Sequence, residues 1–171
     1  FHPVTSEYEE LNNQIETLVD VLLKKDKRNY IIIHPNNDFG SDIILKEYKR
    51  FKGNNRFKIF PSMRFEYFLQ LMKHSDFVIG NSSCGVRETP AIGVPSINIG
   101  TRQNRRSDAP SIIQCDYSRK ELIKALNSIN HLEKRESLIF GSGGSAEKFE
   151  QILLNKKTWQ IGTQKYFVDL T

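Results

Sequence analysis

Short apolar runs alternate with amphipathic stretches along most of the chain, and this alternation constrains the fold more than any other feature. The apolar runs occupy residues 1–4, 30–35, 57–61, 76–80, 96–100 and 112–115. Between them, apolar residues recur at helical spacing over 11–22, 41–51, 65–72, 118–129 and 146–154, and a further helix should end near Gly93. Near-continuous apolar strands separated by helices predict a parallel sheet covered on both faces. The predicted fold class is α/β, Rossmann-like.

Capping residues predict where three of the helices begin. Ser6 and Glu9 have the spacing of a capping box, in which each residue bonds the other's backbone N–H. Ser118 and Glu121 repeat that spacing ahead of a second amphipathic stretch. Ser41 follows a polar turn and is a suitable N-cap for the helix after it.

Length and composition fit one ordinary domain. A chain of 171 residues can bury a core but is short for two full domains. Hydrophobic residues at 38% exclude the apolar depletion that is typical of disorder. The apolar runs are far shorter than the roughly 18 to 20 residues of a membrane span, and no signal peptide opens the chain. We therefore expect a cytoplasmic protein with no membrane partner.

The charge balance favours an anionic ligand. The formal net charge is +5, which suits phosphorylated small molecules as well as larger polyanions. Binding of single-stranded nucleic acid would call for aromatic side chains interleaved with basic ones, and no such platform occurs in the sequence. We expect no nucleic-acid partner.

Cysteine and histidine usage argues against disulfides and metals. The two cysteines, Cys84 and Cys115, fall in a polar turn and at a strand end, and we expect reduced thiols. The four histidines lie far apart without ligand-type spacing: His2, His34, His74 and His131. We predict no metal site.

Three polar turns follow predicted strands: "HPNND" at 34–38, "GNSSCG" at 80–85 and "GTRQ" at 100–103. In open parallel sheets, ligands bind beyond the carboxyl ends of the strands, so these turns should lie at one edge of the sheet. A fourth segment, Ser62–Met63, lies between a strand and a helix, where its backbone is free to contact a base edge. Phe65 and Phe68, just after it, are interpreted as core aromatics of that helix.

The turn "GNSSCGVRE" at 80–88 is built to accept an anion. Ser82 and Ser83 supply hydroxyl donors, Gly85 allows close backbone approach, and a new helix contributes free N–H groups. Glu88 either complements the helix dipole or accepts hydrogen bonds from a ribose diol. The spacing matches neither G-x-G-x-x-G nor the P-loop, so from pattern alone a simple connecting turn stays open.

Three further residues have both a binding and a structural interpretation. Arg102 directly follows a strand and could neutralise a diphosphate, or it belongs to a solvated basic loop with its neighbours. Asn36 either contacts a ligand or forms an Asx turn. His2 lies at the end of the first predicted strand, and a lone histidine is more often structural than catalytic.

Four segments together resemble a known family. "FHPVT", "GNSSCGVRE", "GVPSINIGTRQ" and the glycine turn at 141–144 occur in the order and spacing of the C-terminal half of hydrolysing UDP-N-acetylglucosamine 2-epimerases. The resemblance runs from Phe1 to about Leu154. It implies one of two Rossmann-like domains that face each other across a cleft, as in GT-B glycosyltransferases. We expect residues 1–154 to form the UDP-binding domain and 155–171 to form a tail that packs on an absent N-terminal domain.

The resemblance assigns roles to particular residues. It implies UDP binding by Asn36, Ser62, Met63, Ser82, Ser83, Gly85, Glu88 and Arg102. Within this set the serines and the following amides hold the diphosphate, Glu88 the ribose and residues 62–63 the uridine. His2 matches a histidine near the diphosphate and the reacting sugar, which makes it the catalytic candidate.

The implied reaction needs no cofactor or metal. Loss of the sugar C2 proton and of UDP gives a glycal-like intermediate, and water addition then yields N-acetylmannosamine for sialic acid synthesis. The general acid and base come from the N-terminal domain, so this chain alone should bind UDP weakly without turnover. The full-length protein should be a homo-oligomer. The alternatives are a relative that acts on diacetamido sugars for legionaminic acid, a GT-B glycosyltransferase donor domain, and a non-catalytic nucleotide-sugar module.

Overall fold

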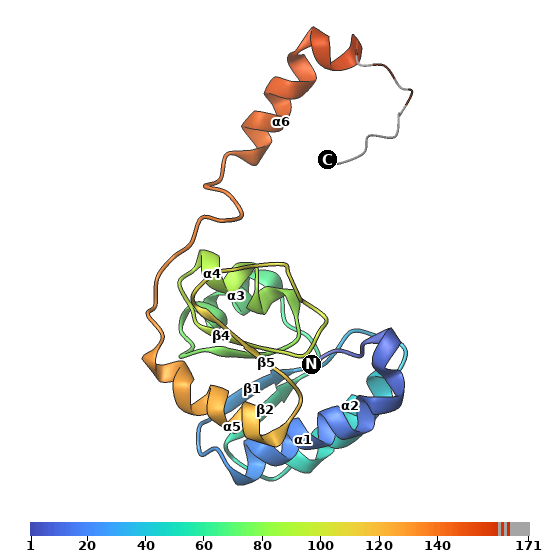
Figure 1. Cartoon of the computed structure of the whole chain (residues 1–171), viewed down its shortest axis with the longest axis vertical. Helices are drawn as coiled ribbons and strands as arrows, with labels where there is room; N and C mark the ends of the chain where they lie inside the picture. The colour runs from blue at the N-terminus through green and yellow to red at the C-terminus, as the bar shows by residue number, and fades with distance from the viewer. Residues whose placement is uncertain (161, 163, 165–171) are drawn as a thin grey trace, which may run out of the picture. The chain divides into compact units, whose positions relative to one another are not determined.

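The structure is a computed structural model that describes residues 1–160, 162 and 164 (Figure 1). The chain divides into two compact units, Phe1–Phe140 and Gly141–Thr171. The expected domain at 1–154 therefore includes one helix, α6 (Ser145–Leu154), that belongs to the second unit. Among the described residues, all the strands lie in the first unit.

Strands and helices alternate through the first unit. It contains η1 (Thr5–Glu10), α1 (Leu11–Lys24), β1 (Tyr30–Ile33), α2 (Ser41–Tyr48), η2 (Lys49–Phe51), β2 (Phe57–Phe60), α3 (Phe65–Lys73), β3 (Val78–Gly80), η3 (Ser83–Gly85), α4 (Glu88–Ala91), β4 (Ser96–Ile99), β5 (Ile112–Cys115), α5 (Arg119–Ser128) and η4 (Ile129–His131), where η marks a 3₁₀ helix.

All strand pairs are parallel, so the predicted α/β class is confirmed. β1 pairs with β2 with Tyr30 opposite Phe57, and β4 pairs with both β3 and β5. The strands form two hydrogen-bonded groups, β1–β2 and β3–β4–β5, rather than one continuous sheet. In the part of the chain that the structure describes, no ladder joins β1 to β3.

Helices cover the strands on both faces. Figure 1 shows α1, α2 and α5 on one side of the strands, with α3 and α4 on the other. The core lies mainly under α1, whose fully buried residues Leu11, Ile15 and Val19 recur at helical spacing. From α2 and the turn after it, Ile44 and Phe51 are buried against the same cluster, as their spacing predicts.

The helix starts follow the capping predictions only in part. Ser118 caps α5 as predicted, with Oγ accepting from the N–H of Glu121 at 3.3 Å. In α2 the capping position belongs to Gly40, which has a φ of +91°, and Ser41 instead donates its hydroxyl to the carbonyl of Asn36. That bond closes the turn after β1.

The capping box predicted at residues 6 and 9 is wrong. Residues 5–10 form a 3₁₀ helix with no side-chain cap, and the backbone is non-helical at Glu7. The Glu7 carboxylate accepts from Gln14 Nε2 at 2.9 Å and from the hydroxyl of Tyr117 at 2.7 Å. These bonds anchor the segment to the loop after β5, which overrides the local capping pattern.

Two other local predictions are wrong. Phe65 is 60% exposed, because it is the first residue of α3 and only Met72, two turns later, is buried. Residues 1–4 form no strand, since no neighbouring strand is hydrogen-bonded to them.

The second unit presents an apolar surface. The side chains of Phe149, Ile152, Leu154 and Trp159 are each more than half exposed, and Trp159 Nε1 donates to the carbonyl of Leu153 at 2.8 Å. Of the tail expected at 155–171, residues 161, 163 and 165–171 lie outside the described residues. Among the helices described, none combines the length and the apolar character that a membrane crossing requires.

Gly100 directly follows β4 and is packed tightly against Tyr117. It has a φ of +71°, and a Cβ there would come within 2.1 Å of the Tyr117 hydroxyl. Gly53 has a similar φ of +81° but open space around it.

We expect Gly53→Ala to lower the free energy of unfolding by about 1 kcal/mol through backbone strain. Gly100→Ala should cost about 1 kcal/mol more, because it also disrupts the bond between Tyr117 and Glu7. Urea unfolding measures both, and equal losses would contradict the packing.

Candidate functional site

Polar loops follow β1, β3 and β4 at the same edge of the structure, because the carboxyl ends of parallel strands point the same way. The loop after β1 carries His34 and Asn36, and the loop after β3 carries Asn81 and Ser82. The loop after β4 carries Arg102. The segment that precedes η1, with His2, lies beside them.

Asn81, directly after β3, joins this segment to the strand ends. Its side chain is fully buried and clamps the backbone of His2 from both sides. Asn81 Oδ1 accepts from the His2 N–H at 2.7 Å, and Asn81 Nδ2 donates to the His2 carbonyl at 2.8 Å. The Asn81 side chain thus bonds both the N–H and the carbonyl of His2, as a neighbouring β-strand would. These two bonds fix the backbone of His2 although no strand pairs with it.

The carbonyl of Asn81 also orders the loop after β4. It accepts from Arg102 Nη1 and from Gln103 Nε2, each at 3.1 Å. Gln103 is buried and Arg102 is half-buried, and the positive charge of Arg102 acts on His2. One residue thereby positions both the predicted histidine and the predicted arginine.

A cavity of about 290 Å³ opens at these strand ends. Five predicted site residues line it: His2, Asn36, Met63, Ser82 and Gly85. His34, Phe68 and Cys84 also line it. The cavity thus brings together predicted residues from four separate segments of the sequence.

Four predicted residues do not line this cavity. Ser62 is exposed in the loop between β2 and α3, and Ser83 begins the 3₁₀ turn η3. Glu88 is the first residue of α4, and Arg102 reaches the carbonyl of Asn81. Ser62, Ser83 and Glu88 are each within a few residues, in sequence, of a residue that lines the cavity. Arg102 is connected to this edge by its hydrogen bond to Asn81.

The turn after β3 leads, as predicted, into a helix that ends near Gly93. The turn itself is 3₁₀, and the helix has only four residues, Glu88–Ala91, so little helix dipole accumulates. The N–H groups of Gly85, Val86 and Arg87 donate to carbonyls within the turn. Gly85 packs on β4, where Ser96 donates its hydroxyl to the Gly85 carbonyl. Anion-binding capacity therefore lies in the serine hydroxyls and in the amides that precede Gly85.

Glu88 carries an unsatisfied group. Its Oε2 is buried and has no hydrogen-bond partner among the residues that the structure describes. Burial raises the pKa of the Cys84 thiol, and the negative charge of Glu88 adds to that effect. A buried acceptor without a donor is costly, so this oxygen is suited to a ligand hydroxyl.

The imidazole of His2 is held neutral. Its pKa is lowered to about 4, mainly by burial and also by the positive charges of the Phe1 amine and Arg102, against a smaller opposing effect of Asp38. The N–H of Asn36 approaches His2 Nδ1 at 3.5 Å. With Nδ1 as acceptor, Nε2 carries the proton and can donate to a ligand.

Sequence reasoning missed the residue that organises the site. Asn81 stands in the quoted turn, but its partners lie 79 residues away at His2 and 22 away at Gln103. The available signal was a side chain able both to donate and to accept, placed directly after an apolar strand. For Cys84 and Phe68 the sequence carried no comparable signal.

A parallel α/β fold with hydroxyls, a guanidinium and an imidazole at the strand carboxyl ends defines the class of Rossmann-like ligand-binding domains. The family model described as UDP-N-acetylglucosamine 2-epimerase matches residues 1–154. The chain belongs to this family.

Curated relatives agree with the family. The chain is 43% identical to a UDP-N-acetylglucosamine 2-epimerase of Neisseria meningitidis serogroup B, over 99% of this chain and 46% of that protein. It is 35% identical to a polysialic acid biosynthesis protein of Escherichia coli, over 91% of this chain and 39% of that protein. The chain thus spans less than half the length of the curated relatives it matches.

A solved structure supports the fold. The UDP-GlcNAc 2-epimerase of Methanocaldococcus jannaschii superposes with a TM-score of 0.65 at 22% identity, covering 89% of this chain and 44% of that one. A second structure of that enzyme, in complex with UDP-GlcNAc and UDP, gives a TM-score of 0.64 at 23% identity, covering 85% and 41%.

Asn81→Ala tests the clamp. The substitution leaves the N–H and the carbonyl of His2 without their partners, so we expect the free energy of unfolding to fall by about 2–3 kcal/mol. Asn54→Ala, which removes one local bond to the Arg56 N–H, should cost about 1 kcal/mol. Equal losses in urea unfolding would show that the clamp contributes no more than an ordinary turn.

His2 should make stability depend on pH. Its folded pKa, about 4, lies below its ordinary value of 6.5, so the unfolded chain binds the proton more strongly. The free energy of unfolding should therefore decrease as pH falls from about 6.5 to about 4. His2→Gln should flatten the slope in that window, whereas His131→Gln, in the exposed turn after α5, should leave it unchanged. A slope that is identical in all three proteins would refute the assignment.

Proposed function

We propose that this chain is the UDP-binding domain of a hydrolysing UDP-N-acetylglucosamine 2-epimerase. The observation that carries the proposal is the convergence of His2, Asn36, Met63, Ser82 and Gly85 on one strand-end cavity, in a chain of this family. A two-domain GT-B-like enzyme would place the sugar between this cavity and a second domain. The N-terminal domain and a homo-oligomeric assembly belong to the same proposal.

Ser82 and Ser83 bind the diphosphate with their hydroxyls and the amides at the start of the turn. Arg102 lies on the Asn81 carbonyl and supplies positive charge from the other side. Charge-assisted hydrogen bonds of this kind stabilise an anion strongly at a partly buried site. Gly85 keeps the turn close to β4, which leaves the cavity free for the phosphates.

Glu88 binds the ribose hydroxyls. Its buried Oε2 lacks a donor, and a vicinal diol can supply one. Met63 lines the cavity, and the backbone of residues 62–63 reads the uracil edge. Asn36 lines the same cavity, where its N–H approaches His2 Nδ1 at 3.5 Å, and it contributes a further contact to the phosphates.

His2 assists departure of UDP. Reaction begins when a base removes the sugar C2 proton and the C1–oxygen bond to UDP breaks, which leaves a glycal-like intermediate. A neutral His2 with its proton on Nε2 can donate a hydrogen bond to the departing diphosphate, where negative charge develops. Water then adds at C1 and a proton returns to C2, giving N-acetylmannosamine for sialic acid synthesis.

The substrate proposal favours UDP-N-acetylglucosamine over diacetamido sugars. Identity is 43% to the Neisseria UDP-N-acetylglucosamine 2-epimerase but 25% to a hydrolysing UDP-N,N'-diacetylbacillosamine 2-epimerase of Legionella pneumophila. The base that acts at C2 belongs to the other domain, so this chain alone should not turn over substrate.

Titration calorimetry with UDP tests the site. We expect Glu88→Gln to weaken binding about tenfold, because a neutral amide is a poorer acceptor for the ribose diol and about 1.4 kcal/mol is lost. Glu133→Gln, an exposed carboxylate after α5, is the matched control and should leave affinity unchanged. If both variants bind UDP as the parent chain does, the ribose assignment is wrong.

The full-length protein with UDP-N-acetylglucosamine tests the reaction. We expect equimolar UDP and N-acetylmannosamine, and about a hundredfold lower kcat for His2→Gln. Transfer of the sugar to an acceptor would identify a glycosyltransferase. Turnover of a UDP-diacetamido sugar alone would identify the legionaminic acid branch, and an unchanged ligand would identify a binding module.

A further inference from the structure

The carboxylate of Glu7 connects three parts of the chain that are distant in sequence. Its Oε2 accepts from the hydroxyl of Tyr117 at 2.7 Å and from Gln14 Nε2 at 2.9 Å, and its Oε1 accepts from the hydroxyl of Thr101. Gln14 lies in α1, Thr101 in the loop after β4, and Tyr117 in the loop after β5. A single side chain of η1 therefore joins the loops that follow two neighbouring strands.

These three contacts are charge-assisted hydrogen bonds. Burial raises the pKa of the Glu7 carboxyl, but the hydrogen bonds from its three partners outweigh this effect and lower the pKa below its ordinary value. Burial, together with the adjacent carboxylate, raises the pKa of Tyr117, so its hydroxyl keeps the proton that it donates. An ionised carboxylate accepts at both oxygens, and hydrogen bonds to a charged acceptor are stronger than those between neutral groups. Glu7 is thus suited to hold these loops in one arrangement.

The loop after β4 is anchored on both sides of Arg102. Immediately before it, Thr101 bonds to Glu7, which restrains the backbone from which the arginine side chain extends. Immediately after it, Gln103 donates to the main-chain carbonyl of Asn81 at 3.1 Å, and Arg102 Nη1 donates to the same oxygen at 3.1 Å. Glu7 and Asn81 therefore fix this loop from two directions.

Glu7 does not line the cavity at the strand ends, so it influences a ligand there through the residues that it holds. Arg102 is the residue through which that influence passes, since its positive charge acts on His2, a side chain that lines the cavity. A long arginine side chain loses conformational freedom when it binds an anion, and this loss is smaller where the backbone beside it is already fixed. A diphosphate gains from this preorganisation, whereas an uncharged nucleoside does not.

We propose that Glu7 is a positioning residue for Arg102 and thereby raises the preference of the site for a nucleoside diphosphate over the uncharged nucleoside. The inference rests on the proposed function, in which Arg102 supplies positive charge to the diphosphate of UDP. Loss of the Glu7 contact frees Thr101 and the backbone beside it, so binding of the phosphates has to order the loop again. The ribose and base contacts of the same proposal lie on other segments, at Glu88 and residues 62–63.

Two substitutions at Glu7 separate the geometry of its contacts from its charge. Glu7→Ala removes all three hydrogen bonds. Glu7→Gln keeps them, because its Oε1 accepts from both partners of the original Oε2 while its Nε2 donates to the Thr101 hydroxyl. Glu10→Ala is the matched control, since it removes a carboxylate of the same 3₁₀ helix that accepts only locally, from Asn13 Nδ2 at 3.3 Å.

Ligand-observed NMR titrations with UDP and with uridine give the ratio of the two dissociation constants for each protein. We expect Glu7→Ala to reduce the preference for UDP about tenfold, which corresponds to partial loss of one charge-assisted hydrogen bond. Glu7→Gln should retain the preference within about twofold, because its neutral hydrogen bonds are weaker but keep the loop in place. Glu10→Ala should leave it unchanged. An equal loss of affinity for both ligands in Glu7→Ala would overturn the proposal, because a purely structural role acts on the whole site.

Thr101→Val gives a second measurement that holds if Glu7→Ala does not fold. It removes the hydroxyl that links Glu7 to the loop and leaves the contacts with Tyr117 and Gln14 in place. We expect the same loss of UDP preference as for Glu7→Ala, and no further loss in the double variant, because both substitutions act on one contact. Additive losses, or an unchanged preference in Thr101→Val, would contradict the proposal.

The same titrations separate this inference from the function on which it rests. If the unsubstituted protein binds UDP no better than uridine, the diphosphate assignment is wrong and the role of Glu7 falls with it. If the unsubstituted protein prefers UDP and Glu7→Ala retains that preference, only the role of Glu7 is wrong.

Discussion

Asn81 holds together the elements on which the site depends. Its side-chain amide bonds the backbone of His2 at 2.7 and 2.8 Å, and its main-chain carbonyl accepts from Arg102 and Gln103. A side-chain amide carries its donor and its acceptor on separate atoms, so it can bond the N–H and the carbonyl of one residue, as a backbone segment lacking a strand partner requires. The buried position excludes water as a substitute for either bond. The loops after β3 and β4 and the segment before η1 therefore form one rigid edge.

Local sequence pattern predicted the parts of this fold that depend on local physics. The buried faces of α1 and α2 follow from helical spacing, and Ser118 caps α5 because its partner is three residues away. Features set by distant contacts were not predictable in this way. The bend at Glu7 depends on Tyr117, 110 residues away, and the Asn81 clamp spans 79 residues. The loops of the candidate site could be predicted because the carboxyl ends of parallel strands lie at one edge of the sheet, whatever the sequence of the loops.

The electrostatics of the cavity suit a ligand that brings its own negative charge. Without one, burial and two neighbouring cations hold the pKa of His2 at about 4, so the imidazole is neutral. A diphosphate beside Arg102 would offset those positive charges and shift the pKa of His2 upward. The histidine would then approach the range in which it can donate a proton as charge develops on the leaving group. The net charge of +5 is thus less informative than the position of one guanidinium.

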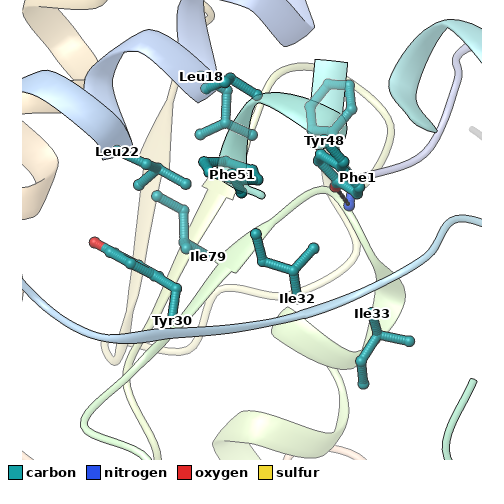
Figure 2. Close-up of a pocket in the computed structure, with 10 residues that line it drawn as sticks. Phe1, Leu18, Leu22, Tyr30, Ile32, Ile33, Tyr48, Phe51 and Ile79 are labelled. Carbon is teal, nitrogen blue, oxygen red and sulfur yellow. Dashed lines mark hydrogen bonds between the residues drawn. The ribbon is translucent and has the colours of Figure 1, made fainter. Parts of the chain in front are cut away.

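An apolar cavity between α1 and the strands adjoins the candidate site, since Phe1, Ile33 and Ile79 line both this cavity and the cavity at the strand ends (Figure 2). The Phe1 amine is buried there, and its positive charge is one of the causes that lower the pKa of His2. The packing of the apolar cavity is therefore coupled to the protonation of the catalytic candidate, because the two cavities share the residues that hold Phe1 and His2 in place.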